Sequence, residues 1–372
     1  MRRATYESSI LSLSCSILSH YGAPHRHGTL APLDPYLDRD WRNVVVMLLD
    51  AMGTHVMDRH LPADSFFTSH RVATISSIFP PTTAAATTTI KSGLSPIEHG
   101  WMGWTSWFDQ AQANVDILIN QLDETGQPAA ADFDYGTRYL GYTDIFTQIG
   151  QATHGQVEAV SVSPFSLRRV QDVVQDCALV RDVCQRPGRH FVYAYWDDPD
   201  DHMHHLGVDS PEAHEDIILA NREIDRLCAD LTDTLVIVIA DHGMLDVKWR
   251  RLREFPDITS CLRHRPSLEP RAMAFFIKEG MDEQFLAGMA AHYPEYEVLT
   301  ARQALDSQLF GPGTPHPLAA GFMGDYMAVT DGPVAIEAIP SDKHLKMVAT
   351  HGGLSAAELD VPLIVLPTPV LR

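Results

Sequence analysis

An unbroken apolar run that ends abruptly in polar residues constrains the fold of this chain more than any other feature. Residues 235–243 read Leu-Val-Ile-Val-Ile-Ala-Asp-His-Gly, which predicts a buried strand followed directly by Asp241 and His242. A second apolar run, Val44 to Leu49, ends in the same way in Asp50. Because ligands of open α/β sheets bind at the carboxyl ends of the strands, we expect these three side chains to share one edge. The alternative is that Asp241 caps a following helix and His242 is an ordinary packed histidine.

Strand and helix patterns alternate along most of the chain, which predicts an α/β fold with a mostly parallel central sheet and helices on both faces. We expect three parts. Residues 1–42 would form an N-terminal amphipathic helix and an irregular arm, and residues 43–247 with 347–372 the catalytic core. Residues 248–346, with a looser pattern rich in Gly and Pro, would form an inserted α+β layer over the active-site edge of the sheet.

Charge and composition exclude some classes of partner. The 372 residues carry a formal net charge of -20, whereas a phosphate backbone requires a basic surface, so we expect no nucleic-acid duplex as partner. No segment approaches the ~18 apolar residues of a membrane span, so we expect no membrane partner and a cytoplasmic location. The five scattered cysteines favour reduced core residues. A small molecule is the expected partner, and the sequence does not indicate an oligomeric state.

Acids and histidines recur where predicted strands or turns end, in segments far apart in the sequence. They are Asp50, Asp200, Asp241, His204, His242 and His351. Buried carboxylates that converge repel one another and cost several kcal/mol each, roughly, unless a cation compensates them. A mixed set of carboxylates and imidazoles suits Zn²⁺ best, with Mn²⁺ or iron as alternatives. We therefore predict a site for two divalent metal ions, an arrangement that supports phosphoryl chemistry.

That chemistry requires a hydroxyl nucleophile beside an anion-binding site, and the segment from Phe79 to Gly93 supplies one. Pro80 and Pro81 set a turn, and the small residues that follow predict a helix that ends at Gly93. Thr82 and Thr83 stand at its N-terminus, where free N–H groups and the helix dipole favour an anion. Either threonine is a candidate nucleophile.

In their order these segments resemble the alkaline phosphatase superfamily, and most of all its type I phosphodiesterase/nucleotide pyrophosphatase branch. The resemblance runs from about Val44 to the C-terminus and is carried by Asp50, Phe79-Pro80-Pro81-Thr82-Thr83, Gly93-Leu94, His99-Gly100, Pro199-Asp200 with His204 and Gly207, Ala240-Asp241-His242-Gly243-Met244 and Thr350-His351-Gly352. It implies one zinc held by Asp50, Thr83, Asp241 and His242. It implies a second zinc held by Asp200, His204 and His351.

The same resemblance implies that Thr83, rather than Thr82, attacks phosphorus and forms a phosphothreonine, which water at the second metal then hydrolyses. A phosphodiesterase or nucleotide pyrophosphatase is the leading interpretation. One departure is Ala86, three residues after Thr83, which has no amide to hold a phosphate oxygen. A phosphomonoesterase, a phosphonate hydrolase or a phosphate-moving mutase of the same superfamily are the alternatives, and a non-catalytic metal-binding domain is the alternative of another class.

Several further residues could contact substrate or replace a ligand. His202 and His205 flank His204 and are the alternatives to it. Lys91 on the predicted helix, Trp104 in the aromatic loop 99–107 and His316 in the inserted layer are candidate substrate contacts. The competing interpretations are a surface lysine, a packing tryptophan and a turn-forming histidine.

Overall fold

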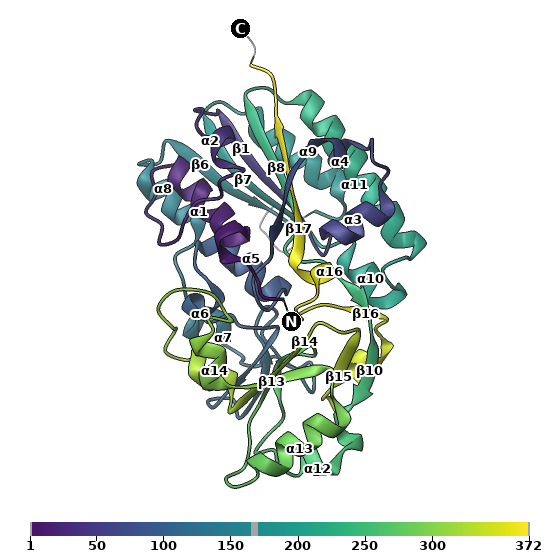
Figure 1. The fold of residues 1–372 in the computed structure, drawn as a ribbon. Helices are drawn as coiled ribbons and strands as arrows, with labels where there is room; N and C mark the ends of the chain where they lie inside the picture. The colour runs from purple at the N-terminus through teal and green to yellow at the C-terminus, as the bar shows by residue number, and fades with distance from the viewer. Residues whose placement is uncertain (1, 165–169, 371–372) are drawn as a thin grey trace.

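In the computed structural model, which describes residues 2–164 and 170–370, a six-stranded sheet forms the upper part of the molecule in Figure 1. Its strand order is β2 (Arg71–Ser76), β17 (Asp360–Pro367), β8 (Thr234–Ile239), β1 (Asn43–Leu49), β7 (Arg189–Trp196), β6 (Val157–Val162). Only β17 runs against the other strands of this sheet. Every residue of β1 and β8 is buried, as their unbroken apolar runs predict. The predicted mostly parallel α/β fold is confirmed.

Helices cover both faces of this sheet, again as predicted (Figure 1). On one face α1, α5 and α8 pack against one another, with bounds Ile10–His20, Thr83–Ser92 and Ile145–Ala152. On the other face lie α3 (Thr54–His60), α4 (Phe66–His70), α9 (Val173–Cys184) and α11 (Pro211–Asp230). Shorter helices are α2 (Asp34–Leu37), α6 (Pro96–His99), α7 (Tyr135–Tyr139), α10 (Asp200–Leu206), α16 (Ala356–Leu359) and the 3₁₀ turns Tyr6–Ser8, Leu252–Glu254 and Lys343–Lys346.

The N-terminal helix α1 is buried more deeply than the amphipathic helix expected from its sequence, because residues 10–18 are all buried, serines included. The serine hydroxyls are satisfied inside the protein. Ser14 donates to the carbonyl of Ile90 at 2.7 Å, and Ser16 donates to Asp34 at 2.5 Å. Since buried hydroxyls are tolerated when they are hydrogen-bonded, α1 can pack against α5 and support it from behind.

A second, antiparallel sheet of seven strands forms the lower part of the molecule in Figure 1. Its order is β13 (Tyr296–Thr300), β14 (Tyr326–Thr330), β12 (Ala272–Phe275), β11 (Ser267–Glu269), β3 (Thr105–Phe108), β4 (Ala113–Asp116), β5 (Gln121–Leu122). Residues 105–122 therefore belong to this layer as well as part of 248–346, which the sequence did not indicate. The link between the two stretches is the pairing of Leu268 with Thr105. Helices α12 (Pro256–Thr259), α13 (Asp282–His292), α14 (Ala301–Asp306) and α15 (Ala319–Met323) accompany these strands.

Two small sheets and one buried ion pair connect the layers. β9 (Leu245–Asp246) pairs with β16 (Ala349–Thr350), and β10 (Lys248–Arg251) pairs with β15 (Val334–Glu337). Arg271, between β11 and β12, makes a bidentate ion pair at 2.7 and 2.8 Å with Glu358 of α16, and both side chains are fully buried. None of the helices in the described part of the chain combines the length and the apolar character that a membrane crossing needs.

The register of the central sheet places the strand ends at one level. Leu49 of β1 lies opposite Trp196 of β7, and Leu48 lies opposite Ile239 of β8. The residues that follow these strands therefore emerge side by side at the carboxyl edge.

Candidate active site

Three carboxylates meet at this edge, one from each strand end. Asp50 follows β1, Asp241 lies two residues after β8, and Asp200 begins α10 after β7. Asp50 is 2% exposed and Asp241 is fully buried. Burial, followed by the charges of the other two acids, raises the pKa of Asp50 well above its ordinary value. Burial also raises the pKa of Asp200, to about 7. Three acids in so little water require a compensating charge.

The carboxylates of Asp50 and Asp241 each have one oxygen held by the protein and one left without a protein partner. Asp50 Oδ2 accepts the hydroxyl of Tyr195, and Asp241 Oδ1 accepts the N–H groups of Ala51 at 3.2 Å and His242 at 2.9 Å. Asp50 Oδ1 and Asp241 Oδ2 are buried and have no hydrogen-bond partner in the part of the chain that the structure describes, and the same holds for Asp200 Oδ1. Such orphaned anionic oxygens are the ones that a cation would satisfy.

Three histidines point Nε2 toward these oxygens, while Nδ1 of each ring is held by a backbone carbonyl. His204 Nδ1 lies 2.9 Å from the carbonyl oxygen of Ala349. His242 Nδ1 lies 3.0 Å from that of Gly243, and His351 Nδ1 lies 3.0 Å from that of Pro81. A carbonyl can only accept, so each Nδ1 carries a proton, and in a neutral ring this leaves the lone pair on Nε2. Burial lowers the pKa of His204 to about 4 and that of His351 well below its ordinary range, so both rings are neutral.

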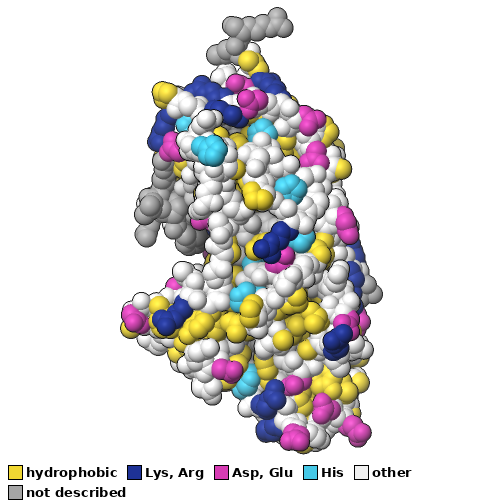
Figure 2. Space-filling model, turned by 90° about the vertical axis from the view of Figure 1, so that its left-hand side faces the viewer, with side chains coloured by type: hydrophobic (Ala, Val, Ile, Leu, Met, Phe, Trp, Pro, Cys, Tyr) yellow, Lys and Arg dark blue, Asp and Glu magenta, His cyan; other side chains and the backbone are white. Residues whose placement is uncertain are grey.

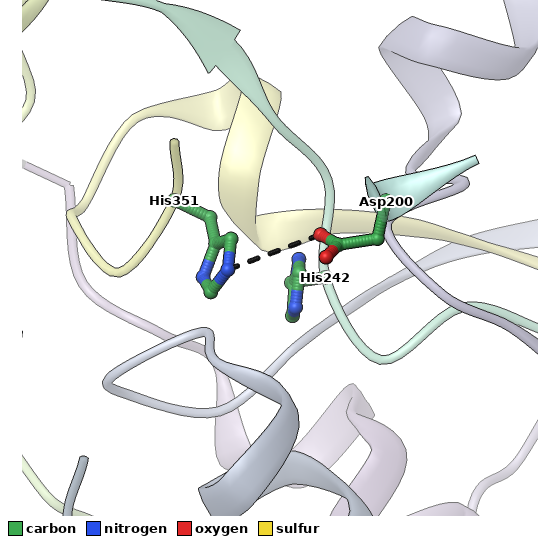
Figure 3. Close-up of side chains that lie close together, drawn as sticks. All are labelled: Asp200, His242 and His351. Carbon is green, nitrogen blue, oxygen red and sulfur yellow. Dashed lines mark ion pairs between the residues drawn. The ribbon is translucent and has the colours of Figure 1, made fainter. Parts of the chain in front are cut away.

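The Nε2 atoms lie as far from the carboxylate oxygens as two ligand atoms of one metal ion would lie from each other. His242 Nε2 lies 3.4 Å from Asp50 Oδ1 and 3.7 Å from Asp241 Oδ2. Asp200 lies 3.4 Å from His204 Nε2 and 3.9 Å from His351 Nε2. Figure 3 shows Asp200 pointing toward His242 and His351, with the ion pair to His351 dashed.

Two overlapping groups of potential metal ligands result, and their atoms lie within 4.8 Å of one another in each group. One group is Asp50, Asp241 and His242, and the other is Asp200, His242 and His351. His242 thus joins the two halves of the cluster, and its ring stacks on that of His351 with centroids 3.8 Å apart. Neutral imidazoles and carboxylates with orphaned oxygens fit a divalent cation such as Zn²⁺.

The hydroxyl of Thr83 faces the first group. Thr83 is the first residue of α5, and its Oγ1 lies 3.3 Å from Asp50 Oδ2 and 3.2 Å from His242 Nε2. Thr82 is the N-cap residue, and among the described residues its buried hydroxyl makes no hydrogen bond to the clustered acids and histidines. The structure therefore brings Thr83, and not Thr82, to the acids and histidines, together with the free N–H groups of the helix start.

Two cavities, of about 300 Å³ and about 460 Å³, open beside Thr83 and share Trp104 and Asp200 in their walls. The smaller also contains His204 and His351, and the larger also contains Asp50. The surface in Figure 2 is hollowed between the upper and lower parts of the molecule, and hydrophobic side chains gather on the lower part.

The structure separates the three candidate substrate contacts. Trp104 lines both cavities and Lys91 lines the larger one. His316 lines neither of them. Its ring packs against Gly100, and its Nδ1 accepts the N–H of Leu318 at 3.2 Å. Its placement fits the alternative interpretation of a turn residue.

The neighbours of His204 have other partners. His202 Nδ1 lies 2.6 Å from Asp216 and 3.6 Å from Asp198, which makes a separate, half-exposed group. His205 is exposed, with Nδ1 bonded to the carbonyl of Asp201. Of the three candidate histidines of this turn, all of which the structure describes, only His204 faces Asp200.

Two residues of the site were missed in the sequence. Tyr195, which holds Asp50, lies inside the apolar strand β7, and only the register of β1 against β7 could have pointed to it. Glu269 ends β11 in the inserted layer and lines the smaller cavity, where it accepts the N–H of Trp104 at 2.6 Å. Burial raises the pKa of Glu269 to about 8. No local sequence signal marks Glu269, because the second sheet alone brings it to the site.

Comparison with known protein families shows to which family the chain belongs. The family model of type I phosphodiesterase/nucleotide pyrophosphatase matches residues 44–353. The chain belongs to this family. The family lies in the alkaline phosphatase superfamily, as the sequence motifs predicted, and it is a family of metal-dependent phosphoric ester hydrolases.

Solved structures of this superfamily share the fold. Murine ectonucleotide pyrophosphatase/phosphodiesterase 5 is 16% identical, with a TM-score of 0.66 over 88% of this chain and 89% of that one. The human protein of the same name is 16% identical, with a TM-score of 0.65 over 87% of each chain. Phosphonoacetate hydrolase from Sinorhizobium meliloti 1021, in complex with phosphonoformate, is also 16% identical, with a TM-score of 0.64 over 87% of this chain and 89% of that one. A comparison with curated protein sequences found no match.

Proposed function

We propose that this protein hydrolyses a small-molecule phosphate ester, of the phosphodiester or pyrophosphate type, with Thr83 as nucleophile at a site for two divalent metal ions. The observation that carries the proposal is the position of Thr83 Oγ1, which lies at the start of α5 and within 3.3 Å of both Asp50 and His242. Membership of the phosphodiesterase family supports it. So does a relative, the murine phosphodiesterase 5, whose threonine-to-alanine variant is described as inactive and in complex with AMP.

In this proposal the seven ligand residues divide between two ions, preferably Zn²⁺, with Mn²⁺ or iron as alternatives. One ion would be held by Asp50, Thr83, Asp241 and His242, and the other by Asp200, His204 and His351. When bound, such ions lower the pKa of a hydroxyl group and neutralise charge on the phosphoryl oxygens.

The protein's own groups would position the reaction. The hydroxyl of Thr83 donates to Asp50 Oδ2, which makes this carboxylate the first acceptor for its proton. The Thr83 oxygen forms a bond to phosphorus while the bond to the leaving oxygen breaks, and the free N–H groups of α5 face the anionic phosphoryl group. Water then adds to phosphorus, the bond to Thr83 breaks, and the hydroxyl is restored.

The test is a matched pair of adjacent variants, Thr83→Ala and Thr82→Ala, assayed with zinc on p-nitrophenyl esters. We expect Thr83→Ala to lower kcat by roughly 10³-fold or more, because the nucleophile is lost, and Thr83→Ser to retain activity. Thr82→Ala should keep most of the wild-type activity. A Thr83→Ala protein with the wild-type rate would refute the proposal. Metal analysis near two ions per chain would support the paired site.

A phosphonate hydrolase or a phosphomonoesterase is the second candidate. Ala86, one turn along α5 from Thr83, has only a methyl group to offer a phosphate oxygen, and Lys91 supplies a cation further along this helix. Rates on a monoester, a diester and a phosphonate ester with one leaving group separate these substrates. Absence of turnover on all three with metal bound would favour the non-catalytic metal-binding domain. A cytoplasmic location stays a prediction.

A further inference from the structure

We propose that Lys91 forms a subsite for a second anionic group of the substrate, a carboxylate or a further phosphate, beside the phosphoryl group that Thr83 attacks. The inference rests on the proposed function of the same site. It adds a substrate class: phosphate esters, anhydrides or phosphonates that carry another negative charge near the reacting phosphorus.

The first support is the geometry of α5. Thr83, Thr87 and Lys91 follow one another at intervals of four residues, so they share one face of the helix, and all three line the larger cavity. Eight residues of helix separate Thr83 from Lys91, a rise of roughly 12 Å between their Cα atoms. Side chains of a helix generally slope toward its N-terminus, so a long side chain at position 91 can extend toward the nucleophile.

The second support is that Lys91 forms no ion pair among the described residues. Its side chain is half-buried, and its amine lies 5.3 Å from the centre of the Tyr193 ring. The charge of Asp144 acts on Lys91 only from a distance and opposes the lowering of the Lys91 pKa by burial. Lys343, in the wall of the smaller cavity, provides the contrast, because it pairs with Asp116 at 3.4 Å and with Asp123 at 4.0 Å. Of the two lysines that the described residues place in the cavity walls, Lys91 is therefore the one without an ion-pair partner.

The rest of the larger cavity determines where an anion would lie. Asp197 and Asp201 line it together with Asp200, so their end of the cavity repels negative charge. Leu118 and Ile119, which are 37% and 46% exposed, form an apolar part of the wall. The Lys91 end is left as the place for an anion.

The anion bound there would not be the reacting phosphoryl group itself. That group must lie within bonding distance of Thr83 Oγ1, at the start of α5, whereas Lys91 stands two turns further along the helix. The hydroxyl of Thr87 lies between them and is already engaged, since it donates to the carbonyl of Thr83 at 2.8 Å. The Lys91 amine therefore contacts a neighbouring group of the substrate.

The experiment measures binding, so that it does not depend on turnover. Titration calorimetry of the zinc-loaded protein compares methylphosphonate with phosphonoacetate, which adds a carboxylate, and with methylenediphosphonate, which adds a second phosphonate. We expect one or both of the latter to bind about 10-fold or more tightly than methylphosphonate, as a charge-assisted contact would give. Lys91→Met should abolish that preference and Lys91→Arg should keep most of it.

Lys278→Met is the control, because Lys278 is exposed, donates to the carbonyl of Ser260 at 2.8 Å and lines neither cavity. It should leave the preference unchanged, and melting curves of all variants confirm that they are folded. Chelation of zinc by methylenediphosphonate would affect every variant equally, so a loss confined to Lys91→Met supports the subsite. Equal binding of the three probes to wild-type protein, or a preference that survives in Lys91→Met, would overturn it. A clear preference without any ester hydrolysis would support the subsite and count against the proposed function alone.

Discussion

Replacing Glu358 with glutamine should destabilise the protein strongly, because it would leave the charge of Arg271 buried without a counter-charge. Both side chains are fully buried, and Nε and Nη2 of the arginine donate to the two carboxylate oxygens. Arg271 also donates to the carbonyls of Gly332 and Val334. Burial alone would raise the pKa of Glu358, but Arg271 holds that pKa below its ordinary value. The pair is therefore ionised at neutral pH.

The expected cost of Glu358→Gln is about 3–5 kcal/mol in the free energy of unfolding, the range found when one partner of a buried ion pair is removed. The double replacement Arg271→Met with Glu358→Leu should cost less than the single one, because no unpaired charge is left. Urea unfolding of the wild-type protein, Arg271→Met, Glu358→Leu and the double variant completes the mutant cycle, and Glu358→Gln is measured beside them.

The matched control is Asp306→Asn, which breaks the exposed pair of Asp306 with Arg302 and should leave the urea midpoint nearly unchanged. A cost below about 1 kcal/mol for Glu358→Gln, or a double variant as unstable as the sum of its two single variants, would show that the reasoning is wrong. Glu358 also accepts the N–H of Gly353 at 2.6 Å. Glu358→Gln should therefore weaken metal binding as well, because the loop that carries His351 loses an anchor.

The remaining predictions concern burial, close packing and charge. Asp176 is fully buried, and neither of its carboxylate oxygens has a hydrogen-bond partner among the described residues. Burial raises the pKa of Asp176 well above its ordinary value, so Asp176→Asn should stabilise the protein. The gain in melting temperature should grow as the pH rises above about 4, where an unburied aspartate would ionise. An Asp176→Asn protein with no gain in melting temperature at pH 8 would contradict this prediction. Gly243→Ala should lower the melting temperature sharply, because its Cβ would lie 2.0 Å from the carbonyl oxygen of Ala357, whereas Gly150→Ala, in the open on α8, should be neutral or stabilising. Removal of the metal by a chelator should lower the melting temperature, and this decrease should become larger from about pH 4 to about pH 7. The reason is that burial raises the pKa of Asp200 to about 7, so ionised Asp200 destabilises the metal-free fold in this pH range. A melting temperature that the chelator leaves unchanged at every pH would count against the cation site.

The central sheet and the convergence of its strand ends could be predicted from the sequence because they depend on local pattern. The apolar runs of β1 and β8 have the length of strands and are rich in β-branched residues, which favours strands over helices, and the residue after such a strand lies at the sheet edge. The start of α5 is marked in the same way, by two prolines and a threonine pair.

The second sheet and its contribution to the site could not be predicted, because they depend on pairing between distant segments. Strands β3, β4 and β5 have only four, four and two residues, too few for an alternating pattern to be recognised. The pairing of β3 with β11 is what brings Glu269 beside Trp104. His316 shows the opposite case, since its position between two prolines suggested a loop over the site but the loop folds back on Gly100.

The three cluster histidines are oriented by peptide carbonyls, those of Ala349, Gly243 and Pro81. A carbonyl is present whatever side chain its residue carries, so substitutions at such positions leave the acceptor in place as long as the backbone path is kept. Mutational drift can therefore replace most of the surrounding sequence without turning the rings. This gives a physical reason why a fold with this cluster can persist among proteins that share only about one residue in six, as 16% identity implies.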